Sequence, residues 1–422
     1  MTTGSGETSP TVAEAAAGFP GAGLGSEVPV RRRGLLVLLG CLTGLTPLAV
    51  DMYLPALPSL TRDLQTTNSA AQLTLAALLL GLASGQLLAG PLSDRLGRRP
   101  PVLAGLGLFA LASLGCAFAP SIGALIGLRF VQGFTGAAAV VVARAVVRDL
   151  YAGVGAARAF ASLMLVMGAA PVLAPVIGAQ VLRMTSWRGI FVVLSFAGLV
   201  LLVVCWRALP ETLAEEHRHD GGMRSTLGVF AMLLRDRRFL LPTLAGGAGF
   251  AAMFAYIAGS PYVLQEIYGL SPQEYSLVFG SNAVLLIALS QVSGRVVHRT
   301  GPARLLLAGA CLSTTGAVLL VLTAELDLGF PLVLLGLLLV VGAVGFTAPN
   351  ATALALAHHG RRAGAASALL GLLQFVFGAI AAALSGLGGQ RADLSMALTM
   401  LGASLLALGC AVRTQVGVRR GG

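Results

Sequence analysis

The chain has 422 residues, of which 56% are hydrophobic and only 11% charged, and its formal net charge is +11. That composition is too apolar for a water-soluble globular protein and excludes this class. The chain contains no lysine, so a Walker A phosphate loop and a Schiff-base site, which both need one, are also excluded.

A polar tail precedes a long series of apolar blocks. Residues 1–30 are rich in Gly, Ala, Ser and Thr, which predicts a disordered tail. Beyond them, blocks of about 20 apolar residues alternate with short polar joints, and a helix of that length crosses a bilayer. We expect twelve spans, near 34–58, 70–92, 101–119, 121–145, 157–182, 188–209, 239–263, 272–293, 303–323, 328–356, 363–387 and 393–413.

The spans divide into two groups of six. The longest polar connection, residues 210–238, reads as a linker between a bundle at 31–209 and a bundle at 239–413, and 414–422 as a second tail. The segment "GPLSDRLGRRP" at 90–100 is echoed by "GRVVHRTGPAR" at 294–304, two spans into each group. Such a repeat indicates a duplicated unit. The predicted fold is an all-α polytopic membrane protein of two pseudo-symmetric six-helix bundles.

The arginines indicate which ends of the spans face the cytoplasm. Most of them lie in the tails, the linker and the joints on the same side. Short cytoplasmic joints carry an excess of basic residues, so both termini are predicted to be cytoplasmic. The positive charge then requires no nucleic acid partner. The exceptions are Arg62, Arg183, Arg188 and Arg391 in outer joints, and Arg129 and Arg144 within spans.

Asp51 is the only acidic residue well inside a predicted span. An ionisable group near the membrane centre costs at least about 2.5–3.5 kcal/mol and should face a cavity or a partner. Asp51 lies seven residues before Pro58 and Arg129 seven residues after Ile122, near the outer ends of their spans, which places both roughly 10 Å deep at 1.5 Å per residue. We therefore expect them to share one cavity.

A carboxylate and a guanidinium at one depth are sufficient to couple proton movement to transport. Movement of Arg129 or of a substrate relative to Asp51 would change how readily the carboxylate takes up a proton. The alternative is a static ion pair that only holds the helices in register.

Two further motifs suggest conformational roles. In "GPLSDRLGRRP", Gly90 permits close helix approach, Gly97 a tight turn, and Asp94 can pair with Arg95 or Arg98, so the cluster could latch one conformation. Simple anchoring by positive charge is the alternative. In the fifth span, "GAAPVLAPVIGAQ" at 168–180 contains Pro171, Pro175 and Gly178, which would bend the helix and let a neighbour pack closely.

Other polar residues within the spans are candidates for a cavity lining. Individually, each is more often a helix–helix hydrogen bond than a ligand contact. The five cysteines and "HRHD" at 217–220 lack metal-ligand spacing, so no metal site is expected. The candidates for the substrate cavity are Tyr53, Gln132, Tyr256, Tyr262, Asn282, Asn350 and Gln374.

These motifs resemble the major facilitator superfamily over nearly the whole chain after residue 30. "GPLSDRLGRRP" is similar to its loop 2–3 signature, and "RFVQGFTGAAAVVVARAVVRDLY" at 129–151 to its span 4 motif. "DMYLPALP", "VRDLYAG" and "APNATALA" resemble the bicyclomycin/chloramphenicol-resistance branch, with the phenicol exporters most similar. The resemblance implies that Asp51 is the coupling carboxylate and Arg129 its partner. It also implies a latch made of Gly90, Asp94, Arg95, Gly97, Arg98, Arg148 and Asp149.

The predicted function is a drug:proton antiporter that exports small apolar antibiotics such as chloramphenicol. It would be a monomeric, multi-pass protein of the bacterial plasma membrane, driven by the proton gradient without a cofactor, and not an enzyme. A proton-coupled importer of a small nutrient and a non-transporting membrane sensor are the alternatives. The apolar lining is less suited to a sugar, which disfavours the importer.

Overall fold

The computed structural model describes residues 30–218, 223–359, 362–389 and 391–421. Within these residues every regular element is a helix, and twelve helices are long and apolar enough to cross a membrane. This confirms the predicted all-helical fold of twelve spans. The tail at 1–29 lies outside the described residues.

The first six spans form the N-terminal bundle. The first span consists of α1 (Val30–Asp51), the short η1 (Leu54–Ala56) and α2 (Leu57–Asp63). The others are α3 (Asn68–Leu96), α4 (Arg99–Ala117), α5 (Ile122–Leu150), α6 (Gly153–Met184) and α7 (Trp187–Ala208).

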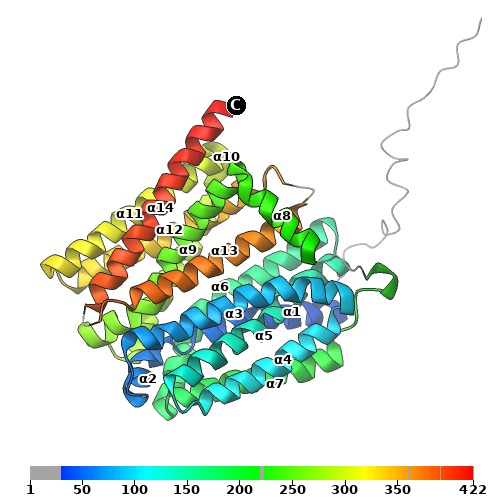
Figure 1. Ribbon diagram of the computed structural model, residues 1–422, viewed down its shortest axis with the longest axis horizontal. Coiled ribbons are helices and arrows are strands. Elements are labelled where there is room, and N and C mark those ends of the chain that lie inside the picture. Colours follow the sequence, from blue (N-terminus) through cyan, green and yellow to red (C-terminus); the bar gives the residue numbers. More distant parts are fainter. Residues whose placement is uncertain (1–29, 219–222, 360–361, 390, 422) are drawn as a thin grey trace, which may run out of the picture.

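The last six spans form the C-terminal bundle. It begins with α9 (Arg237–Tyr262), which continues as a turn of π-helix, η3 (Val263–Ile267). The others are α10 (Pro272–Thr300), α11 (Pro302–Leu326), α12 (Phe330–Leu356), α13 (Ala363–Ser385) and α14 (Ala392–Gly421). Figure 1 shows this green-to-red bundle beside the blue-to-green N-terminal bundle.

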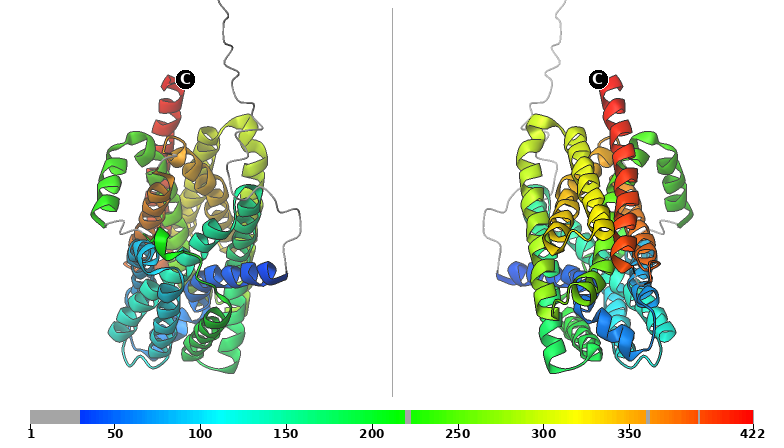
Figure 2. Two further views of the ribbon diagram at one scale, coloured as in Figure 1. Left: turned by 90° about the vertical axis from the view of Figure 1, so that its right-hand side faces the viewer. Right: turned by 90° about the vertical axis from the view of Figure 1, so that its left-hand side faces the viewer.

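The connection between the bundles contains helical structure of its own. The segment predicted as a linker holds η2 (Glu215–His217) and the amphipathic α8 (Met223–Arg235). Phe230 and Leu233 of α8 are buried against Ala366 and Leu369 of α13. At the other end of the chain, α14 continues through most of the predicted second tail, and its last turns extend past the neighbouring helices (Figures 1 and 2).

Glycine allows α3 and α5 to pack backbone against backbone. A Cβ added at Gly81 would lie 2.2 Å from the carbonyl oxygen of Phe130, and one at Gly133 would lie 2.1 Å from that of Leu78. Small residues let membrane helices approach in this way, because lipid supplies no hydrophobic force to hold them together. The close crossing fixes the position of α5 at the level of Arg129.

The bundles meet along two helix pairs, α3 against α13 and α6 against α10. We call the end that carries Asp94, Arg98 and the start of α9 the arginine-rich end, and the opposite end the arginine-poor end. The hydrogen bonds between the bundles that join described residues all lie toward the arginine-poor end. They connect Thr61 with Tyr262, Asn68 with Glu266, Ser69 with Gly386, Gln72 with Ser385, Pro175 with Ser276, and Ala179 with Gln273.

Candidate functional site

The first span is interrupted at Asp51. The helix α1 ends at this residue, and the chain resumes as η1 at Leu54. Pro55 explains the interruption, because it has no N–H to donate to the carbonyl of Asp51 four residues earlier. The proline therefore places the acidic residue at a helix break.

Gly178 brings α6 into contact with this break. A Cβ at Gly178 would lie only 1.8 Å from the carbonyl oxygen of Met52. No side chain larger than hydrogen fits there unless one of the helices moves. The predicted close approach is therefore present, and it is directed at the residue that follows Asp51.

The Asp51 carboxylate is buried without a full set of partners. Its side chain is 4% exposed, and Oδ1 has no hydrogen-bond partner. The break that begins at Asp51 leads into η1, which contacts α9 and α10 of the C-terminal bundle. A buried carboxylate oxygen in this position requires a proton, a cation or a donor. Asp51 thus faces the junction between the two bundles.

Arg129 lies at the predicted depth but does not contact Asp51. Its Nη1 donates to the carbonyl oxygen of Ala49 at 3.0 Å, and its guanidinium carbon lies 4.2 Å from the ring centroid of Tyr53. No nitrogen of Arg129 is within 4.0 Å of an Asp51 oxygen, and its Nε and Nη2 lack hydrogen-bond partners. The expected direct pair is therefore absent from this conformation.

Helix geometry accounts for the separation. At about 100° per residue, Asp51 points about 200° from Ala49 on α1. Arg129 contacts the Ala49 carbonyl oxygen and the ring of Tyr53, which lies in the break after α1. The carboxylate is on the face of α1 opposite to Ala49.

Gln132 extends the Arg129 contacts into the N-terminal bundle. Its Oε1 accepts from Arg129 Nη1 at 2.6 Å, and its Nε2 donates to Ser113 Oγ on α4 at 2.7 Å. Because Gln132 is fully buried, it supports Arg129 and lines no open space in this conformation. Tyr53, whose ring lies against Arg129, has its hydroxyl 3.2 Å from Thr74 Oγ1.

The remaining cavity candidates lie in the C-terminal bundle. The Tyr256 hydroxyl accepts from Asn282 Nδ2 at 3.0 Å, which joins α9 to α10, the two helices that contact η1. Tyr262 lies nearer the arginine-poor end, where its hydroxyl is 2.9 Å from Thr61 Oγ1. Asn350 is directed elsewhere, because it donates to Ser293 Oγ at 2.8 Å. Gln374 is half-buried on α13.

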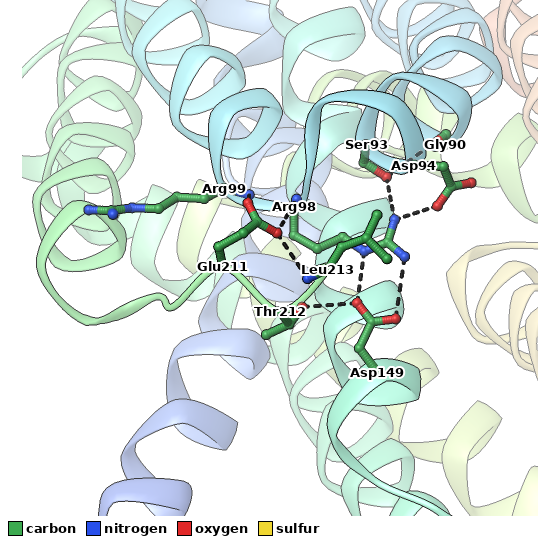
Figure 3. Close-up of polar contacts among 9 residues, drawn as sticks. All are labelled: Gly90, Ser93, Asp94, Arg98, Arg99, Asp149, Glu211, Thr212 and Leu213. Carbon is green, nitrogen blue, oxygen red and sulfur yellow. Dashed lines mark hydrogen bonds and ion pairs between the residues drawn. The ribbon is translucent and has the colours of Figure 1, made fainter. Parts of the chain in front are cut away.

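The predicted latch forms a compact charge cluster (Figure 3). Arg98 is 5% exposed and pairs with Asp94 on α3 and with Asp149 on α5, the latter at 2.8 Å from Nε to Oδ2. Burial alone would lower the pKa of Arg98, but Asp149 and then Asp94 raise it. Arg148 is exposed, and a Cβ at Gly90 would meet no atom within 4 Å, so the close approach expected at that glycine is not made here.

Glu211 completes the cluster and was missed from the sequence. Its carboxylate accepts from the backbone N–H groups of Arg98 at 2.8 Å, Arg99 at 3.0 Å and Leu213 at 3.1 Å (Figure 3). Burial would raise the pKa of Glu211, but these three hydrogen bonds outweigh it and lower the pKa. Gly97, at φ +91°, leaves room for the carboxylate, which a Cβ there would meet at 2.5 Å.

Thr212 attaches the same segment to α5. Its hydroxyl donates to Asp149 Oδ2 at 2.9 Å. The segment that follows α7 therefore donates a hydrogen bond to the latch through Thr212 and accepts hydrogen bonds from it through Glu211. The sequence feature that could have indicated Glu211 is its position next to Pro210, directly after an apolar block. Arg95 also takes part in a contact within this end of the protein.

The bend motif of α6 faces the other bundle as well as α1. Pro171 and Pro175 lie within a continuous helix, and the carbonyl oxygen of Pro175 accepts from Ser276 Oγ at 3.1 Å. One turn later, the Ala179 carbonyl accepts from Gln273 Nε2 at 3.0 Å. The segment therefore joins the break in α1 to α10. Among the described residues, no group of three or more His, Cys, Asp or Glu could hold a metal ion.

Twelve spans in two bundles, with a buried carboxylate at their junction, define a multi-pass membrane transporter rather than an enzyme. The family model described as Major Facilitator Superfamily matches residues 39–412, and the chain belongs to this superfamily. Relatives at 30–39% identity place it in the drug-efflux branch named for bicyclomycin and chloramphenicol resistance.

Three relatives illustrate the match. An uncharacterised transporter of this type from Bacillus subtilis is 39% identical, covering 84% of this chain and 89% of that protein. A bicyclomycin resistance protein homolog of Haemophilus influenzae is 34% identical, with 82% and 87% covered. A chloramphenicol resistance protein of Pseudomonas aeruginosa is 35% identical, with 68% of each covered.

Solved structures agree on the fold. A bacterial homolog of the human lysosomal transporter Spinster superposes with a TM-score of 0.76 at 13% identity, covering 93% of this chain and 98% of that one. A D-xylose-proton symporter gives a TM-score of 0.67 at 16% identity, with 89% and 96% covered.

Proposed function

We propose that the protein exports small, largely apolar antibiotics in exchange for protons, and that phenicols such as chloramphenicol are among its substrates. The observation that carries the proposal is the buried Asp51 carboxylate, which lies at a helix break, faces the other bundle and leaves Oδ1 without a partner. A relative named for chloramphenicol resistance supports the choice of substrate.

Asp51 is the proton site in this mechanism. In a state open at the arginine-poor end, the carboxylate takes up a proton and the drug is released. The protein then closes that end, the proton leaves through the arginine-rich end, and a new drug molecule binds. Tyr256 and Asn282 are the proposed drug contacts, because they are buried on α9 and α10, the helices that contact the break after Asp51.

The orientation follows from the distribution of arginine. The arginine-rich end faces the cytoplasm of a bacterial cell, as the positive-inside rule requires, and both termini lie on that side. The hydrogen bonds between the bundles then close the outer end, so the conformation is inward-facing. Exchange of one proton for a neutral drug moves one charge inward, which contributes about 2.3 kcal/mol per 100 mV.

Arg129 acts as a positioning residue. Through the Ala49 carbonyl and the Tyr53 ring it holds the two turns of the first span that flank Asp51. Its unbonded Nε and Nη2 allow it to change partners when the bundles move. The chain works as a monomer, since one copy contains both bundles, and it requires no cofactor.

Transport into inside-out vesicles with an acidic interior tests the proposal. The wild-type protein should accumulate chloramphenicol, and collapse of the pH gradient should release it. Asp51→Asn should abolish accumulation while leaving a folded protein that still binds the drug. Asp63→Asn, which removes a carboxylate bound to Trp187 and Arg188 at the arginine-poor end, is the matched control.

Three results would contradict the proposal. Full accumulation by Asp51→Asn would remove the carboxylate from the coupling mechanism. Drug binding by the wild-type protein without any accumulation would indicate a sensor. Proton-driven movement of a nutrient in the same direction as the protons would indicate an importer.

A further inference from the structure

A cavity with arginine at its rim lies at the arginine-rich end of the C-terminal bundle, and Asp51 is not among the residues that line it. It has a volume of about 490 Å³ and opens between the start of α9, the end of α12 and the end of α14. Arg237 and Arg238 line it from α9, His358 from the turn after α12, and Arg413 from α14. All four side chains are exposed. The proposed transport cycle uses none of them.

The three helices each present one face to this cavity. The lining residues recur at intervals of four along two of the helices, as Arg237 and Leu241 on α9, and Arg413 and Gly417 on α14, while Leu354 lies in the last turn of α12 and His358 in the turn that follows it. Residues four apart share a helix face. The cationic groups occupy the outer turns, and Leu241 and Leu354 lie one turn deeper. The cavity is therefore cationic at its mouth and apolar at its base.

Among the residues that the structure describes, no acidic residue lines this cavity. Three arginines elsewhere in the protein have carboxylate partners: Arg98 binds Asp149, Arg188 binds Asp63, and Arg391 binds Glu325. Asp236 is the residue that precedes α9, but its carboxylate caps the N–H of Arg238 at 2.9 Å and lies 3.4 Å from His359 Nε2. The arginine side chains of the cavity are therefore available to bind an anionic ligand.

We propose that this cavity binds the phosphate headgroup of an anionic phospholipid. Guanidinium groups suit phosphate oxygens, because they form paired, charge-assisted hydrogen bonds. Basic cavities between helices at the cytoplasmic surface are a recognised form of headgroup site. The apolar base accommodates the first carbons of the acyl chains, and the volume far exceeds that of a single phosphate ion. Both features favour a lipid over free phosphate.

The test measures retained lipid on the full-length protein in detergent by native mass spectrometry. The probe is phosphatidylglycerol, with phosphatidylcholine and inorganic phosphate as separate arms. The test variant combines Arg237→Gln, Arg238→Gln and Arg413→Gln. The matched control combines Arg295→Gln, Arg299→Gln and Arg304→Gln, which removes the same charge from exposed positions at the same end of the same bundle.

We expect phosphatidylglycerol to bind the wild-type protein and the control variant with similar affinity. The test variant should bind about 100-fold more weakly, since each arginine near the surface contributes about 1 kcal/mol and 1.4 kcal/mol is a factor of ten. Replacing the same three arginines by lysine keeps the charge and should restore most of the binding, which separates lost charge from misfolding.

Several outcomes would overturn the proposal. Equal loss in the two glutamine variants would indicate general attraction to positive charge. Equal retention of phosphatidylcholine would remove the role of the anionic headgroup. Displacement of the lipid by millimolar inorganic phosphate would assign the cavity to a free anion.

Discussion

The contact between Gly178 and the helix break allows a sharp test of the site. A Cβ at Gly178 would lie 1.8 Å from the Met52 carbonyl oxygen, and real Cβ atoms essentially never approach closer than 3.0 Å. Gly178→Ala must therefore displace α6 or the break by at least about 1 Å. Forcing an extra carbon into a packed contact costs about 1–3 kcal/mol.

Gly168 provides the matched control ten residues earlier in α6. A Cβ there would lie 3.6 Å from the Ile287 side chain, which is an ordinary contact. Gly168→Ala should be neutral or stabilising by about 0.5–1 kcal/mol, because alanine is the better helix former. The two substitutions are chemically identical and share the gain in helix propensity, so the difference between them, about 1–3 kcal/mol, isolates the contact with Met52.

Thermal unfolding in detergent and drug accumulation in vesicles measure the two consequences. Gly178→Ala should unfold at a lower temperature than Gly168→Ala and should lose transport, because Asp51 lies next to the displaced carbonyl. If both variants unfold at one temperature and transport equally well, the close approach has no role in holding the break.

Two further predictions concern the ends of the protein. Because Glu211 has a lowered pKa, the stability it contributes is present above the ordinary glutamate pKa and is lost as the pH falls through the lowered value. Glu211→Gln should cost about 1 kcal/mol at neutral pH and flatten the decline of unfolding temperature with acid, whereas Glu215→Gln should not; an unchanged pH profile would refute this. Tyr262→Phe removes the bond to Thr61, worth about 1 kcal/mol. It should favour opening of the arginine-poor end about fivefold in spin-label distance measurements, with Tyr268→Phe as control; unaltered populations would count against that bond.

The spans and the buried charges could be predicted from the sequence because both depend on local composition. Twelve apolar blocks of sufficient length leave little choice of fold, and a carboxylate such as Asp51 in one of them is conspicuous whatever its neighbours. The depth of Arg129 was also predictable, since it follows from the rise of a helix. The depth of a residue does not determine, however, toward which neighbouring helix its side chain points.

The missing Asp51–Arg129 pair depends on rotation about the axis of α1. A count of residues from the outer end of a span gives the depth of each residue. It does not show which neighbouring helix each side chain faces. That direction is set by contacts with other helices, such as the Ala49 carbonyl that takes Arg129 Nη1. The interruption of the first span could have been predicted from the missing N–H of Pro55. The contact of this interruption with Gly178 could not, because it depends on how α6 packs in the folded protein.

Glu211 illustrates the second limit of sequence reasoning. A carboxylate in a polar connection has no local reason to be distinguished from Glu215 or Glu216. Its importance arises because Gly97 and the first N–H groups of α4 lie beside it. In the same way, the sequence of α8 predicts part of a linker, because its packing against α13 is apparent only in the structure.

The attachment of Glu211 also sets a limit on motion. Residues up to Leu213 are held by the N-terminal bundle, and α8 from Met223 packs on the C-terminal bundle. The chain between those two residues acts as a tether. At about 3.3–3.6 Å per residue, a fully extended segment of that length reaches about 33–36 Å. The tether thereby gives an upper bound on how far the arginine-rich ends can separate, and shortening it should stop the transport cycle before the rest of the fold is affected.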